Sequence, residues 1–216
     1  MFKLSIVDMS CGGAVTRNLL HGGQFFQGPQ VHAVTPETQL VTITVGGNDI
    51  GYVGDLSMLA ARNSDSLFGW LVRTFWQGPN KAAERDYAQL GSELTATIRA
   101  VQRRAPTATI ILATYPTIVP RTGSCATIGL TEAEAAEMRT VGNQLAAVTA
   151  AVAKQTDVLL VDMHQLGANH SACSLKPWVS GWANGGIAPF HPTLAGAKAT
   201  AKSITKILAR ERQSLP

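Results

Sequence analysis

One short segment constrains the fold of this chain more than any other. Residues 40–45, Leu-Val-Thr-Ile-Thr-Val, alternate and are rich in β-branched side chains, which pack well on a pleated sheet. Gly46 and Gly47 follow, and glycine lets a backbone turn tightly at the end of a strand. A strand with an ordinary turn over Asn48 and Asp49 is the simplest interpretation. Because ligands of open α/β sheets bind at the carboxyl ends of strands, Asn48 is also a candidate donor to a developing oxyanion.

The rest of the chain alternates strand and helix patterns. Besides residues 40–45, strands are predicted over 3–8, 109–114 and 157–161, and 109–114 is typical of a strand buried on both faces. Helical patterns lie between and after these strands. Such alternation predicts a parallel sheet with helices on both faces. We therefore expect a three-layer α/β/α fold in a single domain over residues 1–216.

Three helices have clear sequence signals. The first is predicted over residues 81–104, and Pro106 follows its end. Thr131 and Glu134 form a capping box that opens a second helix, which runs to about residue 154. Thr193 can cap the last helix. The predicted buried face of that helix carries Ala197, Ala201, Ile204 and Leu208.

Charge and hydrophobicity exclude two classes of partner. The chain has 18 basic and 14 acidic residues, a net charge of +4, and no basic stripe interleaved with aromatic residues. We therefore expect no nucleic-acid partner. No apolar run approaches the roughly twenty residues that span a bilayer, so we expect no membrane span.

The three cysteines leave two interpretations open. Cys125 and Cys173 both lie in segments rich in glycine and serine, so they could form a bridge in an oxidising compartment, with Cys11 left over. Alternatively, all three are free thiols. His164 and His170 have no metal-ligand spacing with His191, and we predict no metal site.

Polar turns follow the predicted strands, and a histidine precedes the last helix. Ser10-Cys-Gly-Gly-Ala14 follows the first strand, and His191-Pro-Thr-Leu-Ala-Gly196 opens the last helix. Acyl transfer needs a nucleophile, a base that takes its proton, and donors to the tetrahedral oxyanion. These turns and the histidine could supply all of them on one edge of the sheet.

In this order, the three blocks resemble those of the SGNH (GDSL-type) hydrolases, a family of esterases and lipases with a flavodoxin-like fold. The resemblance covers nearly the whole chain. It implies that the Gly13 backbone and the Asn48 side chain donate to the oxyanion and that His191 is the general base. It implies no metal or organic cofactor.

The chain departs from the family pattern at the residue that orients the histidine. Many members have an aspartate three residues before it, where this chain has Ala188. The main-chain carbonyl of Ala188 is then the candidate partner of His191 Nδ1. A carbonyl can fix the tautomer but stabilises the imidazolium less than a carboxylate does. We expect a catalytic dyad.

A larger departure is the absence of the block that carries the family's nucleophilic serine, Gly-Asp-Ser or a close variant. Three explanations compete. The chain could be cut short at its N-terminus and lack esterase activity. A partner chain, such as a second copy in a homodimer, could supply the missing strand and complete the sheet. Alternatively, residues 3–8 could take the central position in the sheet, which would make Ser10 the nucleophile. We rank a shortened chain or altered activity first and Ser10 second.

The sequence therefore predicts a carboxylic ester hydrolase acting on a small-molecule ester, with a serine nucleophile, the base His191 and the donors Gly13 and Asn48. The alternative is an inactive or shortened domain of the same fold that only binds ligand. Trp178, Trp182 and residues 51–78 are expected to wall the substrate cleft. We expect an exported protein, because relatives of this pattern usually are.

Overall fold

Three parallel strands form the centre of the structure, a computed structural model that describes residues 5–186 and 188–214. The strands lie in the order β1-β2-β3, and their bounds are Leu40–Ile43, Thr109–Ala113 and Leu159–Val161. Parallel strands need crossover connections, which the helices provide here. All three strands therefore end at the same side of the sheet, which we call the carboxyl edge.

The helices of the described residues alternate with these strands. In chain order they are α1 (Thr16–His21), α2 (Tyr52–Arg62), α3 (Leu67–Phe75), α4 (Tyr87–Arg104), α5 (Glu132–Thr156), α6 (Met163–Leu166) and α7 (Leu194–Ser214). Short 3₁₀ turns are Gln24–Phe26, Gln30–Ala33 and Ala82–Glu84. No helix of the described residues is long and apolar enough to cross a bilayer.

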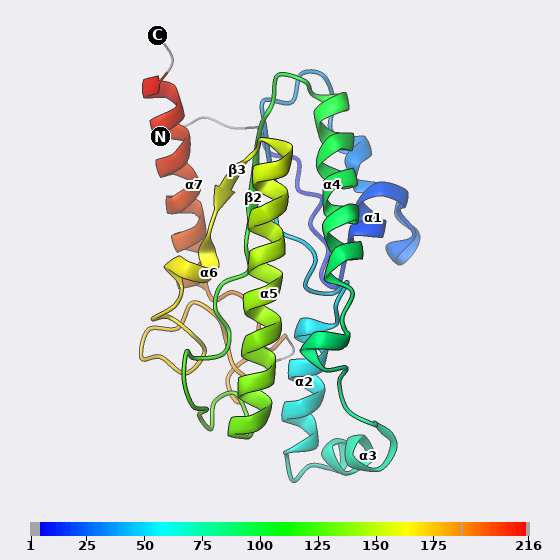
Figure 1. Ribbon diagram of the computed structural model, residues 1–216, viewed down its shortest axis with the longest axis vertical. Coiled ribbons are helices and arrows are strands. Elements are labelled where there is room, and N and C mark those ends of the chain that lie inside the picture. The colour runs from blue at the N-terminus through cyan, green and yellow to red at the C-terminus, as the bar shows by residue number, and fades with distance from the viewer. Residues whose placement is uncertain (1–4, 187, 215–216) are drawn as a thin grey trace.

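Helices cover both faces of the sheet and give the three layers that the sequence predicts (Figure 1). Helices α4 and α5 cover one face, where strand residues share a buried cluster with Leu94, Ile98, Met138 and Leu145. Helix α7 covers the other face. There a second cluster joins Ile111, Ala113 and Val161 of the strands to Ile204, Ile207 and Leu208. The three-layer α/β/α fold is confirmed.

The strand predicted over residues 3–8 is wrong for the part that the structure describes. Residues 5–8 have no regular secondary structure and are exposed, and residues 3 and 4 lie outside the described residues. Ser10 therefore does not stand at the end of a strand. Strand β1 is left as one edge of the sheet.

The predicted buried face of α7 is partly wrong. Ala197 and Ala201 are exposed, whereas Ala199 and Ile207 pack against the sheet. The cause is Gly196, where a Cβ would lie 2.1 Å from the Trp178 carbonyl oxygen. This close approach sets the rotation of the helix about its axis.

A disulfide ties two loops of the carboxyl edge together. Cys125, between β2 and α5, is bonded to Cys173, between α6 and α7. Of the two interpretations of the cysteines, the bridge is confirmed, and Cys11 is a free thiol.

Candidate active site

The turn after β1 is built around close backbone contacts that only glycine permits. Gly46 has φ +111°, and a Cβ on Gly47 would lie 2.9 Å from the ring of Tyr115, which follows β2. Burial raises the pKa of Tyr115 to about 12, so its hydroxyl stays protonated at neutral pH. The two strand ends thus pack directly on each other, and this packing positions Asn48.

The structure brings the two predicted oxyanion donors together. Asn48 Nδ2 donates a hydrogen bond to the Ala14 carbonyl over 3.0 Å, so the carboxamide adjoins the turn that contains Gly13. An amide nitrogen carries two hydrogens, and the second remains for a ligand. Gly13 has φ +81°, and its N–H takes part in no hydrogen bond among the described residues.

A buried threonine joins the turn after β1 to helices α1 and α4 through hydrogen bonds. Its role was not predicted from the sequence. Thr16, at the start of α1, is fully buried, and its Oγ1 lies 2.5 Å from both Asp49 Oδ1 and Glu93 Oε2. Its backbone N–H also donates to Asp49 Oδ1 over 2.9 Å. Hydrogen bonds from Thr16 and then Gln89 lower the pKa of Glu93. Asp49 therefore joins the β1 turn to α1, rather than only stabilising its own turn.

A cavity of about 760 Å³ opens beside Asn48. Part of the predicted wall segment 51–78 does line it, through Gly51, Asp55 and Gly78, and α4 contributes Glu93. Arg85 is 8% exposed and pairs with Asp55 over 2.8 Å. Burial raises the pKa of Asp55, although Arg85 opposes the shift. The cavity wall is therefore largely polar, and it is held in place by an ion pair between buried Arg85 and half-buried Asp55.

His191 is oriented by a carbonyl, but not by the predicted one. Its Nδ1 lies 2.9 Å from the Pro189 oxygen, so the prediction of Ala188 is wrong. A carbonyl can only accept, which places the hydrogen on Nδ1 and leaves the lone pair on Nε2. The backbone turns at Phe190, which has φ +63°, and this brings the ring back to the carbonyl two residues earlier.

The segment around His191 is anchored at the carboxyl edge. Ser180 N donates to the His191 carbonyl over 2.9 Å, and Thr193 Oγ1 caps α7 by accepting from Gly196 N over 3.2 Å. A Cβ on Gly167, at the end of α6, would lie 3.4 Å from the Trp178 ring, so the two pack closely. Since α6 follows β3, His191 lies at the same edge of the sheet as Asn48. The imidazole itself is exposed.

Ser10 is hydrogen-bonded within its own segment. Its hydroxyl and its N–H both bond to Asp8 Oδ1, and these bonds lower the pKa of Asp8. Within residues 5–186 and 188–214, no hydrogen bond joins His191 to Ser10, Gly13 or Asn48. The structure thus brings the two predicted donors to one turn and orients the predicted base, and no hydrogen bond among the described residues joins them to a hydroxyl.

The two predicted tryptophan walls have structural roles instead. Trp178 stacks on His170, with ring centroids 4.3 Å apart, and packs under α7. Trp182 packs against the main core. Neither lines the cavity beside Asn48.

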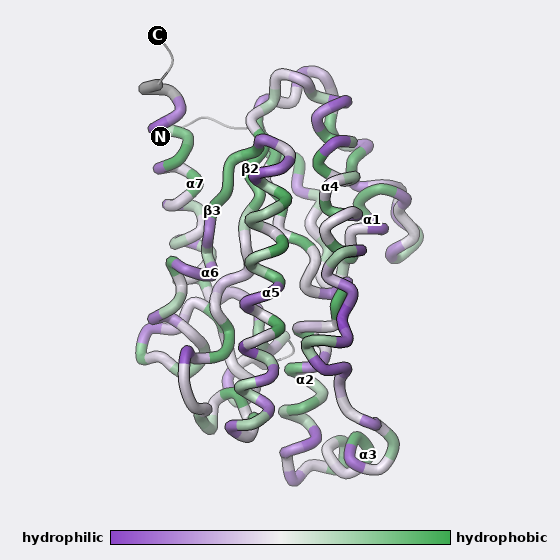
Figure 2. Tube along the Cα trace, in the orientation of Figure 1, coloured by the Kyte–Doolittle hydropathy of each residue, from purple (hydrophilic) through white to green (hydrophobic). Residues whose placement is uncertain are grey.

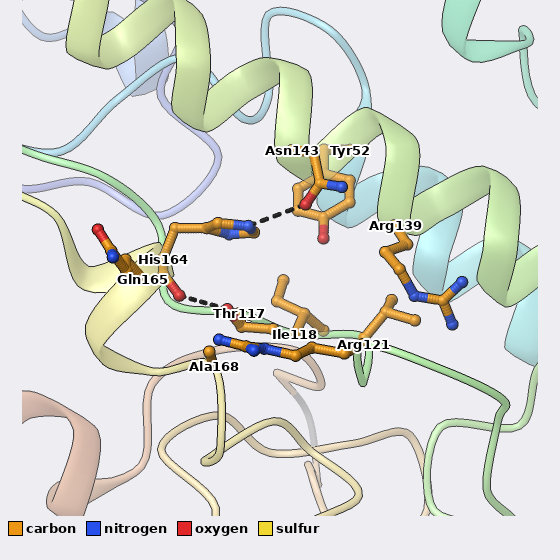
Figure 3. Close-up of a pocket in the computed structure, with 10 residues that line it drawn as sticks. Tyr52, Thr117, Ile118, Arg121, Arg139, Asn143, His164, Gln165 and Ala168 are labelled. Atoms are coloured by element: carbon orange, nitrogen blue, oxygen red, sulfur yellow. Dashed lines mark hydrogen bonds between the residues drawn. The ribbon is translucent and has the colours of Figure 1, made fainter.

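A second cavity of about 260 Å³ lies on the α5 side of the sheet, and none of the four predicted site residues lines it (Figure 3). His164 Nε2 lies 3.0 Å from Asn143 Oδ1 there. Burial lowers the pKa of His164, although Asp162 opposes the shift. Across the described residues, no group of three or more His, Cys, Asp or Glu side chains is placed to hold a metal ion.

Comparison with known proteins gives consistent matches. The profile of a family described as the GDSL-like lipase/acylhydrolase family matches residues 2–199. A lipase of Streptomyces rimosus is 28% identical over 189 residues, which cover 87% of this chain and 64% of the relative. Lipase 1 of Streptomyces coelicolor is 26% identical over the same shares. The chain thus spans less than two thirds of the length of these two curated relatives.

Solved structures match at the level of the fold. The crystal structure of the extracellular lipase from Streptomyces rimosus has a TM-score of 0.65 at 27% identity, and the match covers 89% of this chain and 77% of that one. Phospholipase A1 from Streptomyces albidoflavus has a TM-score of 0.68 at 23% identity, with 92% and 78% covered.

Proposed function

Because this chain belongs to the GDSL-like lipase/acylhydrolase family, we propose that it hydrolyses carboxylic esters, with Gly13 and Asn48 as the oxyanion donors and His191 as the general base. The observation that carries this proposal is the 3.0 Å hydrogen bond from Asn48 Nδ2 to the Ala14 carbonyl. It supports the proposal because it holds the Asn48 carboxamide against the turn that carries the Gly13 N–H, and a tetrahedral oxyanion is stabilised by such donors. The lipase relatives make acyl esters the first substrates to test.

The proposed mechanism follows from the tautomer of His191. Its Nε2 accepts the proton of the attacking hydroxyl, and the imidazolium then returns that proton to the leaving alkoxide. The acyl group, now bonded to the nucleophile oxygen, is released when a water gives its proton to Nε2 and attacks the acyl carbonyl, and the imidazolium returns the proton to the nucleophile oxygen. Meanwhile Gly13 and Asn48 hold the negative charge that forms on the carbonyl oxygen. Pro189 orients the ring through its carbonyl, which offers less charge stabilisation than a carboxylate.

The nucleophile is the open part of the proposal. Ser10 or a residue outside this chain supplies the hydroxyl. For Ser10 to act, its hydroxyl must exchange the Asp8 carboxylate for the His191 imidazole, because it now donates to Asp8 Oδ1. Residues 5–10 are exposed and form no strand or helix, so this rearrangement breaks no regular structure.

The test is hydrolysis of p-nitrophenyl butyrate by wild type and His191→Ala. Loss of a general base lowers kcat/KM by about 10²- to 10⁴-fold. His32→Ala is the matched control, because His32 is also exposed and its imidazole has no hydrogen bond among the described residues. It corrects for direct attack of surface imidazoles on activated esters. Equal rates for wild type and His191→Ala would contradict the assignment of the base.

A second candidate function is ligand binding without turnover, which is favoured by the bonding of the Ser10 hydroxyl to Asp8 and not to His191. Ser10→Ala distinguishes the two possibilities. If Ser10 is the nucleophile, this substitution abolishes hydrolysis as fully as His191→Ala. If wild type, Ser10→Ala and His191→Ala all hydrolyse the ester no faster than buffer alone, the chain does not turn the ester over, and binding is the remaining function.

We further propose that the open edge of β1 pairs with a strand of a second copy. Strand β1 has a partner strand on one side, and its far edge carries backbone groups that can pair. Ile6 and Val7, in the nearby N-terminal segment, are 78% and 71% exposed. We expect light scattering to give twice the chain mass of 22.8 kDa and hydrogen exchange to show β1 amides protected at high concentration. A single-chain mass at every concentration would contradict pairing.

A further inference from the structure

The cavity of about 260 Å³ beside α5 is lined by two arginines and by no acidic side chain. Arg139, on α5, donates through Nε and Nη2 to the carbonyls of Pro120 and Gly123 over 2.5 and 2.8 Å, which fixes the side chain and leaves Nη1 for a ligand. Arg121, in the loop after β2, is exposed, and its guanidinium has no hydrogen bond among the described residues. Neither arginine forms an ion pair in the same part of the chain.

The loops at this cavity do not offset the two positive charges. Residues 117–130 and 165–177 contain no acidic side chain. Asp162 precedes the second loop, at the end of β3, and it does not line the cavity. Its Oδ1 accepts from Gln165 N over 3.0 Å and from Thr114 Oγ1 over 3.1 Å, so this carboxylate oxygen is occupied by the start of α6 and the end of β2.

The acidic side chains of α5 do not offset the charges either. Glu134 is paired with Arg62, and Glu137 accepts from a backbone N–H of the 3₁₀ turn before α4. Glu132, the first residue of the helix, lies about two turns before Arg139 and does not line the cavity. The guanidinium charges therefore remain for a ligand, and they favour an anion.

A buried tyrosine hydroxyl faces the same space. Tyr52, the first residue of α2, is 3% exposed, and its hydroxyl takes part in no hydrogen bond among the described residues. Figure 3 shows the hydroxyl pointing into the space between His164 and Arg139. Gly142 makes room for it, because a Cβ there would lie 2.5 Å from the hydroxyl oxygen. Burial raises the pKa of Tyr52, although Arg139 opposes the shift, so the hydroxyl stays protonated and can donate.

An asparagine adds a further oriented donor. Asn143 lies one turn after Arg139 on α5, a helix along which hydrophilic residues recur among hydrophobic ones (Figure 2). His164 Nε2 lies 3.0 Å from Asn143 Oδ1. Burial lowers the pKa of His164, so the ring is neutral near pH 7 and its Nε2 hydrogen is donated to that oxygen. The carboxamide is thereby held with its Nδ2 hydrogens left as donors.

From this geometry we propose that the cavity beside α5 binds a phosphate group. Arg121 and Arg139 pair with the phosphate oxygens, and the Tyr52 hydroxyl and Asn143 Nδ2 donate to them. A phosphate group carries about 1.5 to 2 negative charges at pH 7, which matches two guanidinium charges better than the single charge of a carboxylate. The cavity is smaller than the roughly 300–1,000 Å³ of most ligand pockets, so the ligand is inorganic phosphate or a small phosphate monoester.

The proposal does not depend on the proposed hydrolysis, because none of the predicted catalytic residues lines this cavity. Binding is measured by isothermal titration calorimetry at neutral pH and low salt. Inorganic phosphate and glycerol 3-phosphate are the probes, and the tighter of the two identifies the source of the phosphate group. Butyrate is the carboxylate for comparison. We expect Arg121→Gln and Tyr52→Phe each to bind the tighter probe about tenfold or more weakly than wild type, because each loses a hydrogen bond to a charged group.

Arg103→Gln is the matched control for the change of charge. Arg103 lies in the last turn of α4, outside the cavity. Like Arg121, it is exposed and its guanidinium has no hydrogen bond among the described residues. Thermal melts by circular dichroism verify that the variants fold. Since Arg121 is exposed, its substitution tests the proposal even if Tyr52→Phe destabilises the protein.

Each outcome decides the proposal. Weaker binding by Arg121→Gln and by folded Tyr52→Phe, with unchanged binding by Arg103→Gln, supports it even if wild type hydrolyses no ester. An absence of saturable wild-type binding overturns it, as does an equal loss in Arg103→Gln or wild-type affinity in either cavity variant. Butyrate binding as tightly as the phosphate probes also overturns it, because the cavity would then not select a phosphate group.

Discussion

At the scale of single residues, Thr16 connects the candidate site to the rest of the fold. Its one hydroxyl hydrogen serves two carboxylates, Asp49 and Glu93, that are 33 and 77 positions away. We expect Thr16→Val to lower the free energy of unfolding by about 1–3 kcal/mol at neutral pH, because it removes the hydroxyl that bonds these two part-buried, charged acceptors. Urea unfolding measures this loss.

The same substitution has a predictable pH dependence. Hydrogen bonds hold the pKa of Glu93 below its ordinary 4.5 in the folded protein, so their stabilisation is present above pH 4.5 and is lost as pH falls through the lowered pKa. The difference in free energy of unfolding between wild type and Thr16→Val should therefore shrink in acid. Thr97→Val is the control, since Thr97 is equally buried but donates to a backbone carbonyl. If the stability losses caused by Thr16→Val and by Thr97→Val depended on pH in the same way, the assignment of the acid dependence to Glu93 would be wrong.

The sequence predicts the position of a single residue well where a short motif determines the local backbone conformation. The Asn48 turn was predictable because two glycines follow a β-branched run, and the local spacing also marked His191 as the residue that opens the last helix. The partner of His191 was predicted one residue too early, because the positive φ of Phe190 is not visible in the sequence. The role of Thr16 could not be predicted, since no local pattern reports a contact over 77 positions.

At the scale of elements, capping residues explain where the helices begin and which predicted boundaries are confirmed. Helix α5 begins where the capping box predicts, with Glu134 N donating to Thr131 Oγ1 over 3.3 Å. Helix α4 begins at Tyr87, later than predicted, because Asp86 caps it by accepting from Gln89 N. The strand predicted over 3–8 fails over its described residues 5–8, because an alternating pattern forms a strand only beside a partner. The exposure of Leu67, Phe68 and Phe75 on α3 is likewise not visible in the periodicity, which reports apolar residues but not which side of a helix packs.

At the scale of the whole molecule, the fold class follows from the order of strands and helices, but the carboxyl edge depends on links between distant loops. The loop after β2 meets the loop after α6 through the Cys125–Cys173 disulfide and a 3.0 Å hydrogen bond from Ala172 N to the Ile118 carbonyl. Those loops adjoin the segment that carries His191, through Trp178. The site therefore relies on a small sheet whose loops are held by one covalent link.

This link gives a prediction for the molecule as a whole. The bridge joins residues 48 positions apart, and a loop of that size corresponds to about 4 kcal/mol of stabilisation in the chain-entropy account. We expect the double variant Cys125→Ser, Cys173→Ser to lose stability of this order in urea unfolding. Reducing agent should destabilise wild type equally and leave the double variant unchanged. Cys11→Ser, which removes the free thiol, should stay sensitive to reductant.

Because the bridge holds the loops beside His191, the proposed ester hydrolysis should fall at urea concentrations below global unfolding in the double variant. Loss of activity only together with global unfolding would show that the disulfide stabilises the fold without positioning the site.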